Sequence, residues 1–453
     1  MPFGIKITSL KLLCLIVRAA TLFRPRTNKA SGIEVQKPRV LVISTQRWPI
    51  PVRIASALAN AGFLVAAISP SRSFIGRTRA VHRRYSYRVW ARSSSIADAI
   101  HDWSPDFLVC ADDQSVSELH RLHFLTANGP KSERSASLVD LIERSLGARD
   151  GFEFTTRKSK LLSLAESLGV RCPSTAFISG QHIEHQLEAA SYPILVKADG
   201  SWGGKFVRIV ENANQARARI SEFQLPSNWP TAVRELLVRF IPPSITEWIS
   251  RDLPAICLQN FVQGSPANRA VVCWKGRVLA GVSVRVHKTV YTFGPASVVE
   301  IIDSPEMSDA AEKLVNHLKL SGLVGFDFVV DSENQAWFIE MNPRVTPVSY
   351  LGRSGTDLSA ALFFELTGIN PCSPLAAEKG KLIALFPQEL QRSSHSEFVS
   401  TGYDDVPWED PELVLAVLNS VMKGGILKRF GMRRRNRQNS VIQRLQQKTS
   451  EGT

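Results

Sequence analysis

The fold of this chain is constrained most by a pair of short apolar runs that carry acidic residues. Residues 323–342 contain two strand-like runs joined by a polar connection at residues 332–335, which predicts a β-hairpin. Glu340 and Asn342 are two residues apart, so their side chains point to one face of the hairpin. With that connection, Asp327 lies directly opposite Glu340, with the two β-carbons about 5 Å apart. The hairpin therefore presents two carboxylates and one amide on a single patch.

A divalent cation is the expected occupant of this patch. The oxygens of Asp327, Glu340 and Asn342 repel one another unless a cation lies between them. Hard oxygen ligands from few residues suit Mg²⁺, and Mn²⁺ is a second possibility. Arg344 follows on the same face and is suited to hold a phosphoryl or carboxylate group in a fork. The alternative is a solvated acidic edge, but Asp327 stands between two phenylalanines, which argues against exposure.

A second segment, from Tyr192 to Val210, has the features of a phosphate-binding element. An apolar strand carries Lys197 near its end, and the loop that follows contains three glycines and Lys205. Glycines let backbone N–H groups approach phosphate oxygens, and lysines supply the counter-charge. The spacing is not that of a Walker loop. For this segment alone, an ordinary hairpin with a lysine lying along its surface is an equal alternative.

Residues 38–130 show the alternation of a small parallel α/β unit. Three apolar runs, 39–44, 63–69 and 107–111, are separated by helical and polar segments. Ligands of such sheets gather at the carboxyl ends of the strands. The candidates there are Gln46, Arg47, Asp112 and Asp113. Each of them alone is more often a turn or helix-cap residue.

From about residue 150 the pattern changes to helices mixed with antiparallel strands. Helices are expected at 158–168, 213–223, 309–320 and 411–422, and antiparallel strands at 258–262, 270–274 and 278–286. Six cysteines without a CxxC pair predict reduced, mostly buried thiols. His182 and His185 have no evident partner for a metal.

The net charge of +14 is confined to the two ends of the chain. Residues 1–32 contain six bases and no acid, and residues 421–453 contain nine bases and one acid, so the body is neutral. No aromatic residues interleave the basic cluster, which disfavours nucleic acid as a partner. The first segment is too short and too charged to span a membrane. A surface-lying amphipathic helix and a frayed leader are both open, so we expect a cytoplasmic protein with peripheral membrane contact as an option.

The lysine–glycine segment and the acidic hairpin, in this order, resemble the ATP-grasp superfamily, in particular the branch of biotin carboxylase and carbamoyl-phosphate synthetase. The resemblance covers about residues 38–370. It implies an α/β fold in which a small parallel domain precedes a two-lobed ATP-grasp part of α+β type, with ATP and Mg²⁺ as cofactors. For the nucleotide it implies Lys158, Lys197, Gly203, Gly204, Lys205, Gln259, Asn260 and Val262, the last three through a hinge backbone. For the metal it implies Asp327, Glu340 and Asn342, and for catalysis Arg344, Lys288 and Arg285.

The same resemblance divides the chain. The expected parts are a basic leader at 1–37, a pre-ATP-grasp domain at 38–145, an N-terminal lobe with flap and lid insertion at 150–255, a C-terminal lobe at 256–372 and a C-terminal extension at 373–453. Two departures from the family pattern are Trp202 and Phe206, which replace flap glycines. Ser349, Tyr350 and Arg353 are expected near the acceptor substrate.

The resemblance implies an ATP-dependent ligase that activates a small-molecule carboxylate as an acyl phosphate and joins it to an amine, less often a thiol. One alternative is a bicarbonate-using carboxylase or carbamoyl-phosphate-type enzyme, although the chain has no biotin-carrier motif and no glutaminase portion. The other alternative is a non-catalytic nucleotide-binding sensor or scaffold. The acid, the amine and the oligomeric state are not predicted.

Overall fold

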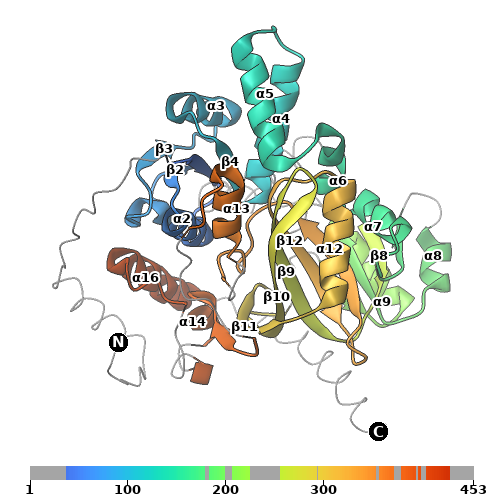
Figure 1. Cartoon of the computed structure of the whole chain (residues 1–453). Coiled ribbons are helices and arrows are strands. Elements are labelled where there is room, and N and C mark those ends of the chain that lie inside the picture. Colours follow the sequence, from blue (N-terminus) through green and yellow to red (C-terminus); the bar gives the residue numbers. More distant parts are fainter. Residues whose placement is uncertain are drawn as a thin grey trace. The chain divides into compact units, whose positions relative to one another are not determined.

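The computed structural model describes residues 37–178, 183–198, 207–224, 256–292, 294–352, 357–371, 379–393, 396–398 and 405–428 (Figure 1). The chain divides into two compact units. One contains residues 30–286 and 300–381, and the other contains residues 287–299 and the chain from Leu382 onward. The domain boundaries expected from the sequence stay a prediction.

A four-stranded parallel sheet opens the larger unit. Its strands lie in the order β3 (Arg83–Ser86), β2 (Leu64–Ser69), β1 (Arg39–Ile43), β4 (Phe107–Cys110). The consecutive residues Val40 to Ile43 are all buried. Since neighbouring side chains point to opposite faces, both faces of this strand are covered, which explains the continuous apolar run in the sequence. The helices of this region are α2 (Ile50–Ala61), α3 (Arg92–Trp103), α4 (Asp113–Ala127) and α5 (Glu133–Leu146). The predicted parallel α/β unit is confirmed.

A second sheet has four antiparallel strands in the order β5 (Thr175–Phe177), β8 (Ile256–Asn260), β6 (Ile194–Ala198), β7 (Val207–Val210). Helices α8 (Ile183–Ala189) and α9 (Ala213–Gln224) pack on one face of it, around Val196 and Leu258. The side chains of Lys197 and Gln259 therefore belong to the other face. We expected residues 258–262 to join the strands at 270–286; instead β8 inserts beside β6.

The third sheet carries the acidic hairpin. Its order is β13 (Ala336–Asn342), β12 (Gly322–Val330), β9 (Ser265–Trp274), β10 (Arg277–Thr289), β11 (Ala296–Ile302), β14 (Leu382–Ala384). β12 and β13 are antiparallel, and Asp327 is paired with Glu340, as predicted. The pairing is irregular between Asp327 and Phe328, which is a local bulge at the acidic position.

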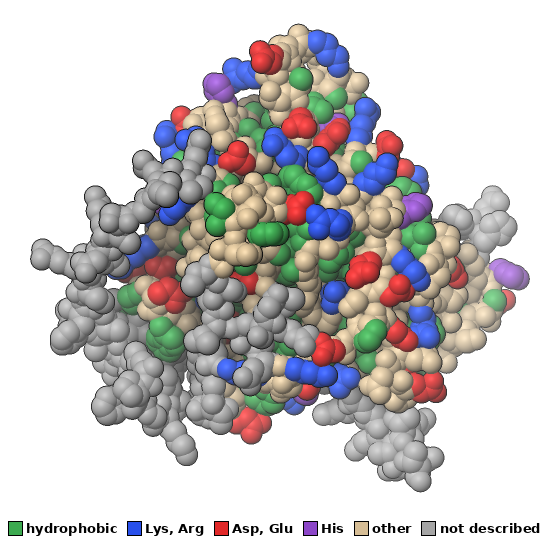
Figure 2. Space-filling view, in the orientation of Figure 1, with side chains coloured by type: hydrophobic (Ala, Val, Ile, Leu, Met, Phe, Trp, Pro, Cys, Tyr) green, Lys and Arg blue, Asp and Glu red, His purple; other side chains and the backbone are tan. Residues whose placement is uncertain are grey.

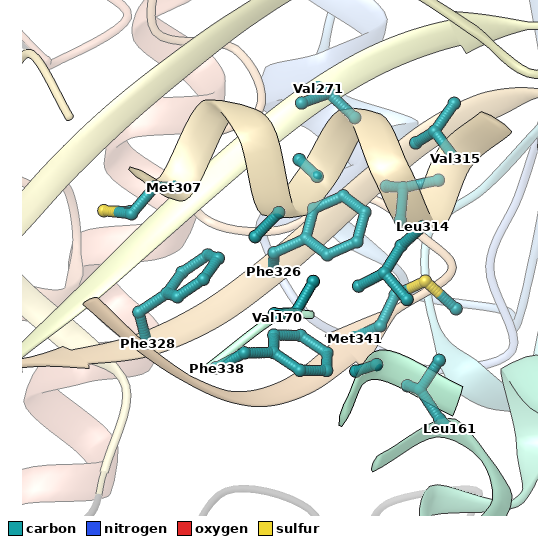
Figure 3. Close-up of a cluster of buried hydrophobic side chains, with 14 of the residues drawn as sticks. Leu161, Val170, Val271, Met307, Leu314, Val315, Phe326, Phe328, Phe338 and Met341 are labelled. Carbon is teal, nitrogen blue, oxygen red and sulfur yellow. The ribbon is translucent and has the colours of Figure 1, made fainter. Parts of the chain in front are cut away.

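The hairpin is fixed by an apolar core on one face. Phe326, Phe328 and Phe338 are buried there, against α12 (Pro305–His317) and residues from α7 (Lys158–Ser167) (Figure 3). α12 begins earlier than expected because Ser304 caps it and Pro305 occupies its first turn. The core occupies the face of Phe326, so Asp327 points away from it.

The start of β12 is joined to the end of α5. Gly147 and Leu320 form an isolated β-bridge, and the N–H of Ser321 donates to the carbonyl of Leu146 at 3.2 Å. Gly147 and Gly322 both have left-handed backbones, with φ of 110° and 97°. A β-carbon on either glycine would lie 2.6 Å from a backbone oxygen of the other segment, so only glycine fits these positions.

Further elements complete the described chain. They are α6 (Phe152–Thr156), α13 (Leu358–Thr367), α14 (Gln388–Arg392), α16 (Pro411–Lys428) and two short 3₁₀ helices at Phe74–Arg77 and Arg149–Gly151. Acidic and basic side chains are interspersed on the face drawn in Figure 2, in keeping with a neutral body. None of the described helices is long and apolar enough to cross a membrane. Residues 1–36 of the predicted leader and residues 429–453 of the basic tail lie outside the described residues.

Candidate active site

The acidic patch is built by three neighbouring strands. Asp327 on β12 is paired with Glu340 on β13 and, on its other side, with Asn268 on β9. Asn268 donates its amide to Oδ1 of Asp327, and Asn342 donates to Oδ2 at 3.0 Å. Both carboxylate oxygens of Asp327 thus accept an amide N–H. Asn268 was not predicted, because only the pairing of β9 with β12 brings it here.

The electrostatics of the patch favour a bound cation. Burial and the nearby Glu340 carboxylate raise the pKa of Asp327 to about 7, against the opposing effect of Asn342 and Arg344. Two adjacent carboxylates can keep both charges only when a positive ion lies between them. The part of the chain that the structure describes has no cluster of three or more His, Cys, Asp or Glu side chains for a metal. Two carboxylates plus amide oxygens instead fit Mg²⁺, which retains several waters.

The side chain of Asn342 forms hydrogen bonds to both Asp327 and Arg344. Its Nδ2 donates to Asp327, while its Oδ1 accepts from Arg344 Nη2 at 3.0 Å. An amide that ligates a cation does so through oxygen, so its Oδ1 would have to turn towards Asp327 when the cation binds. The patch can therefore change its hydrogen bonding without moving the backbone.

Arg344 connects the patch to the parallel sheet. Its Nε lies 3.0 Å from Oδ2 of Asp113, and the N–H of Val345 donates to the carbonyl of Cys110 at 3.0 Å. The Arg344 side chain is only 13% exposed, so the guanidinium end of this ion pair is largely shielded from solvent, whereas Asp113 is 49% exposed. Asp113 is thus a sheet-edge candidate that the structure brings to the acidic patch.

Asp112 has a structural role at the same edge. It is buried and caps α4 by accepting from the N–H of Ser115 at 2.9 Å. It also accepts from the N–H and hydroxyl of Thr45 at 2.7 and 2.8 Å. This agrees with the helix-cap alternative that the sequence left open.

Lys197 and Gln259 are brought together on the second sheet. The Lys197 ammonium donates to Oε1 of Gln259, whose Nε2 donates to the Thr175 hydroxyl at 2.9 Å. That hydroxyl donates in turn to the carbonyl of Pro173 at 2.9 Å. Because the carbonyl can only accept, the order of donors fixes the Gln259 oxygen towards Lys197. The Gln259 amide is neutral, so this hydrogen bond itself does not cancel the positive charge of Lys197.

The other predicted nucleotide residues are placed only in part. Lys158 is the first residue of α7, and Val262 follows β8. The backbone N–H of Asn260 donates to Ser174 at 2.9 Å, so it serves the sheet and is not available to an adenine. Gly203, Gly204 and Lys205 lie outside the described residues, as do Trp202, Phe206, His182 and Arg353.

Arg285 is not brought to the acidic patch. It pairs with Ala267, which pairs with Phe328, whereas Asp327 belongs to the adjacent row with Asn268. Arg285 therefore faces the opposite side of the sheet, because a shift of one residue reverses a strand side chain. It lies 3.4 Å from Oδ1 of Asn334 in the hairpin turn. Lys288 is exposed and belongs to the smaller unit.

Two of the residues expected near the acceptor are described. The hydroxyl of Ser349 accepts from the N–H of Thr346 at 2.8 Å, and Ser349 is buried. The ring of Tyr350 lies under the guanidinium of Arg53, 4.6 Å away. Ser349 thus shapes the loop after Arg344, and Tyr350 contacts α2.

Comparison with known proteins identifies the fold that carries this site. Residues 156–348 match the family model described as ATP-grasp domain. The chain carries an ATP-grasp domain. The predicted resemblance to the ATP-grasp superfamily is thereby confirmed for residues 156–348, and the α/β class with its small parallel sheet is confirmed as well.

Solved structures share the fold at low identity. An L-amino acid ligase from Bacillus licheniformis is 15% identical with a TM-score of 0.51, covering 76% of this chain and 77% of that one. The biotin carboxylase domain of Hydrogenobacter thermophilus 2-oxoglutarate carboxylase, in complex with MgADP, ADP and bicarbonate, is 14% identical with a TM-score of 0.51, covering 75% and 71%. An N5-carboxyaminoimidazole synthetase from Staphylococcus aureus, complexed with ADP, is 12% identical with a TM-score of 0.51, covering 83% and 93%. A search of curated proteins gives no significant match.

Proposed function

We propose that this ATP-grasp protein is an ATP-dependent ligase that joins a small-molecule carboxylate to an amine through an acyl phosphate. The observation that carries the proposal is the pairing of Asp327 with Glu340 on one patch, beside Asn342 and Arg344. Such a patch suits a magnesium–nucleotide complex, and the largely shielded Arg344 adds a positive charge next to it. The ATP-grasp domain supports the coarser statement of ATP-dependent ligation.

The roles of the individual residues follow from their chemistry. Asp327, Glu340 and Asn342 would hold the magnesium ion, which supplies charge neutralisation at the phosphates. Lys197, oriented by Gln259, adds positive charge at the nucleotide. Arg344 stabilises the charge that develops as the γ-phosphoryl moves from ATP to a carboxylate oxygen and ADP leaves. Attack of the amine on the acyl phosphate then releases phosphate and forms the amide.

No step of the proposed reaction needs a nucleophile from the protein. Catalysis in this scheme comes from positioning and fixed charges, as is usual for phosphoryl transfer. Exclusion of water from the acyl phosphate is also required, and the predicted flap for this role falls on residues outside the described chain.

A screen of acid–amine pairs for ADP release tests the proposal. The blank is the double variant Asp327→Ala with Glu340→Ala, which should be inactive with every pair. The matched control is Glu333→Ala, which removes an exposed carboxylate from the turn of the same hairpin and should keep full activity. If the double variant releases ADP as fast as the parent protein, the assigned site is wrong.

Two outcomes of the same screen would favour the alternatives. ADP release that depends on bicarbonate and needs no added amine would indicate a carboxylase-type reaction. Binding of magnesium–ATP without turnover on any pair would indicate a nucleotide-binding sensor or scaffold.

A further inference from the structure

The carboxyl edge of the parallel sheet gathers polar groups that the proposed reaction does not use. β1 and β2 are adjacent and parallel, and the N–H of Ser44 bonds to the carbonyl of Ile68 just beyond β1. The loops that follow these two strands therefore leave the sheet side by side. The first loop carries Arg47 and the second carries Arg72.

Arg47 and Arg72 are close enough to repel each other. Burial lowers the pKa of Arg47, and the positive charge of Arg72 lowers it further. A pair of like charges raises the free energy of the folded protein, and an anion placed between them removes that cost. The acidic patch shows the same effect with the opposite sign of charge, since two carboxylates there favour a bound cation.

The backbone of Arg72 is also unfavourable. Its φ is 63°, in the left-handed region that glycine adopts freely and residues with a β-carbon avoid. Residues held in such a conformation cluster at active sites and ligand clamps, although Ser104, Lys275, Lys319 and Asn334 of this chain also have a positive φ. Here it places a guanidinium in the turn after β2, next to the loop of Arg47.

The other polar groups of the edge are hydrogen-bond donors, or carboxylates that already have hydrogen-bond or ion-pair partners. The hydroxyls of Ser73 and Tyr87, in residues only 7% and 5% exposed, have no hydrogen-bond partner among the described residues. Ser73 follows β2 and belongs to the same edge, whereas the ring of Tyr87 packs in the core of the parallel sheet, close enough to Glu118 for that carboxylate to act on its hydroxyl. Of the two acids after β4, Asp112 is occupied by four donors and Asp113 by Arg344. The edge is therefore suited to an anion.

The edge adjoins the acidic patch through a series of contacts within the larger unit. Asp113 pairs with Arg344, which bonds to Asn342, which bonds to Asp327. On the other side, Asp112 holds the backbone of Thr45, two residues before Arg47. A small molecule that reaches from Arg344 to Arg47 thus follows a continuous line of contacting residues.

We propose that the acid substrate carries a second anionic group, a carboxylate or a phosphate, which Arg47 and Arg72 bind at the carboxyl edge of the parallel sheet. This inference rests on the proposed function, because the first carboxylate is the one that reacts beside Arg344. It names the substrate class: an acid with two anionic groups.

Calorimetric titration of the full chain with inorganic phosphate, succinate and acetate tests the anion site directly, without ATP. Arg47→Gln and Arg72→Gln should each weaken binding of phosphate or succinate by about tenfold, since each removes a charge-assisted hydrogen-bond donor. The control Arg77→Gln, an exposed arginine of the same β2–β3 connection, should change binding by less than about twofold. Preference for phosphate or for succinate identifies the second group, and acetate should bind weakest. Absence of binding to the parent protein, unchanged binding in both variants, or an equal loss in the control overturns the proposal.

Arg72→Gly separates binding from folding. Glycine relieves the left-handed backbone, so its Tm should not fall while phosphate or succinate binding is lost. A lower Tm together with the loss of binding would mean that Arg72 is structural.

The two proposals fail in different ways. Anion binding that responds to Arg47→Gln and Arg72→Gln, with no ADP release from any pair, leaves the site standing and removes the ligase. ADP release from monocarboxylic acids that is unaffected by both variants keeps the ligase and removes the site.

Discussion

The guanidinium of Arg344 and the carboxylate of Asp113 form an ion pair at 3.0 Å, joining the end of the acidic hairpin to the start of α4. The Arg344 side chain is 13% exposed and that of Asp113 is 49% exposed. Asp113 thus holds a shielded cation from the solvent side. The direction in which Arg344 points depends on a residue of the preceding parallel domain.

Replacing Asp113 by Asn should slow ADP release by about tenfold, because Arg344 loses its carboxylate and turns towards Asp327 and Glu340. The Tm should change little, since Asp113 is half-exposed. The control Asp140→Asn breaks a surface pair with Arg144 at 3.1 Å and should leave the rate unchanged. Equal rates in Asp113→Asn and the parent protein would contradict the positioning of Arg344 by Asp113.

The acidic patch should make magnesium binding depend on pH. The pKa of Asp327 is raised to about 7, so a proton must leave before the cation binds, and affinity should rise with pH between 6 and 8. Titration of Mg²⁺ by calorimetry at several pH values measures this. Asp327→Asn should weaken binding and flatten the pH profile.

The same group should affect the stability of the metal-free protein. A folded pKa above the unfolded value of 3.8 means that the folded state holds the proton more tightly. The resulting stabilisation is complete below the unfolded pKa and is lost as pH rises through about 7. Urea unfolding at pH 5 and pH 8 should show a smaller decrease in the free energy of unfolding for Asp327→Asn than for the parent protein. An identical decrease in both proteins would disprove the shift.

The neutral amide of Gln259 should be required for nucleotide affinity. In Gln259→Glu a carboxylate cancels the charge of Lys197, and we expect the Kd for magnesium–ATP to rise by about tenfold. Thr175→Val removes the hydroxyl that orients the amide and should give a smaller loss. The difference between the two Kd values should shrink at high salt, because the Glu effect is electrostatic. Tighter binding by Gln259→Glu would refute the role of Lys197.

Close packing under the loop after Arg344 gives a test of the structure alone. A β-carbon on Gly325 would overlap with the Thr346 methyl group, so Gly325→Ala should lower the free energy of unfolding by about 1–3 kcal/mol. Thr346→Ser removes that methyl group and keeps the hydroxyl bonded to Ser349. The double variant should recover most of the stability in urea unfolding. Additive losses would show that the two residues are not in contact.

Local patterns were sufficient to predict the hairpin register. The two apolar runs and the short polar connection determine that Asp327 faces Glu340, and the structure has this pairing. Asn268 could not be predicted in the same way, because it reaches Asp327 only through the pairing of β9 with β12, which no local pattern specifies. The Arg344–Asp113 pair is missed for the same reason, since its partners lie in different parts of the chain.

Long-range pairing also explains the expectations that did not hold. β8 reads as a neighbour of the strands that follow it, yet it pairs with β5 and β6, from earlier in the chain. Arg285 was expected among the catalytic residues, but the register of β10 against β9 turns it to the other face. A sequence pattern gives the period of a strand, whereas its neighbours are set by tertiary packing.

The glycine contacts between the end of α5 and the start of β12 limit how this protein can be re-engineered. Gly147 and Gly322 let two backbones touch where any larger residue would collide. A chimera that exchanges the first sheet for that of a relative would disrupt this backbone contact, even if every strand kept its length. Domain grafts should therefore transfer residues 145–151 and 319–322 as a matched set.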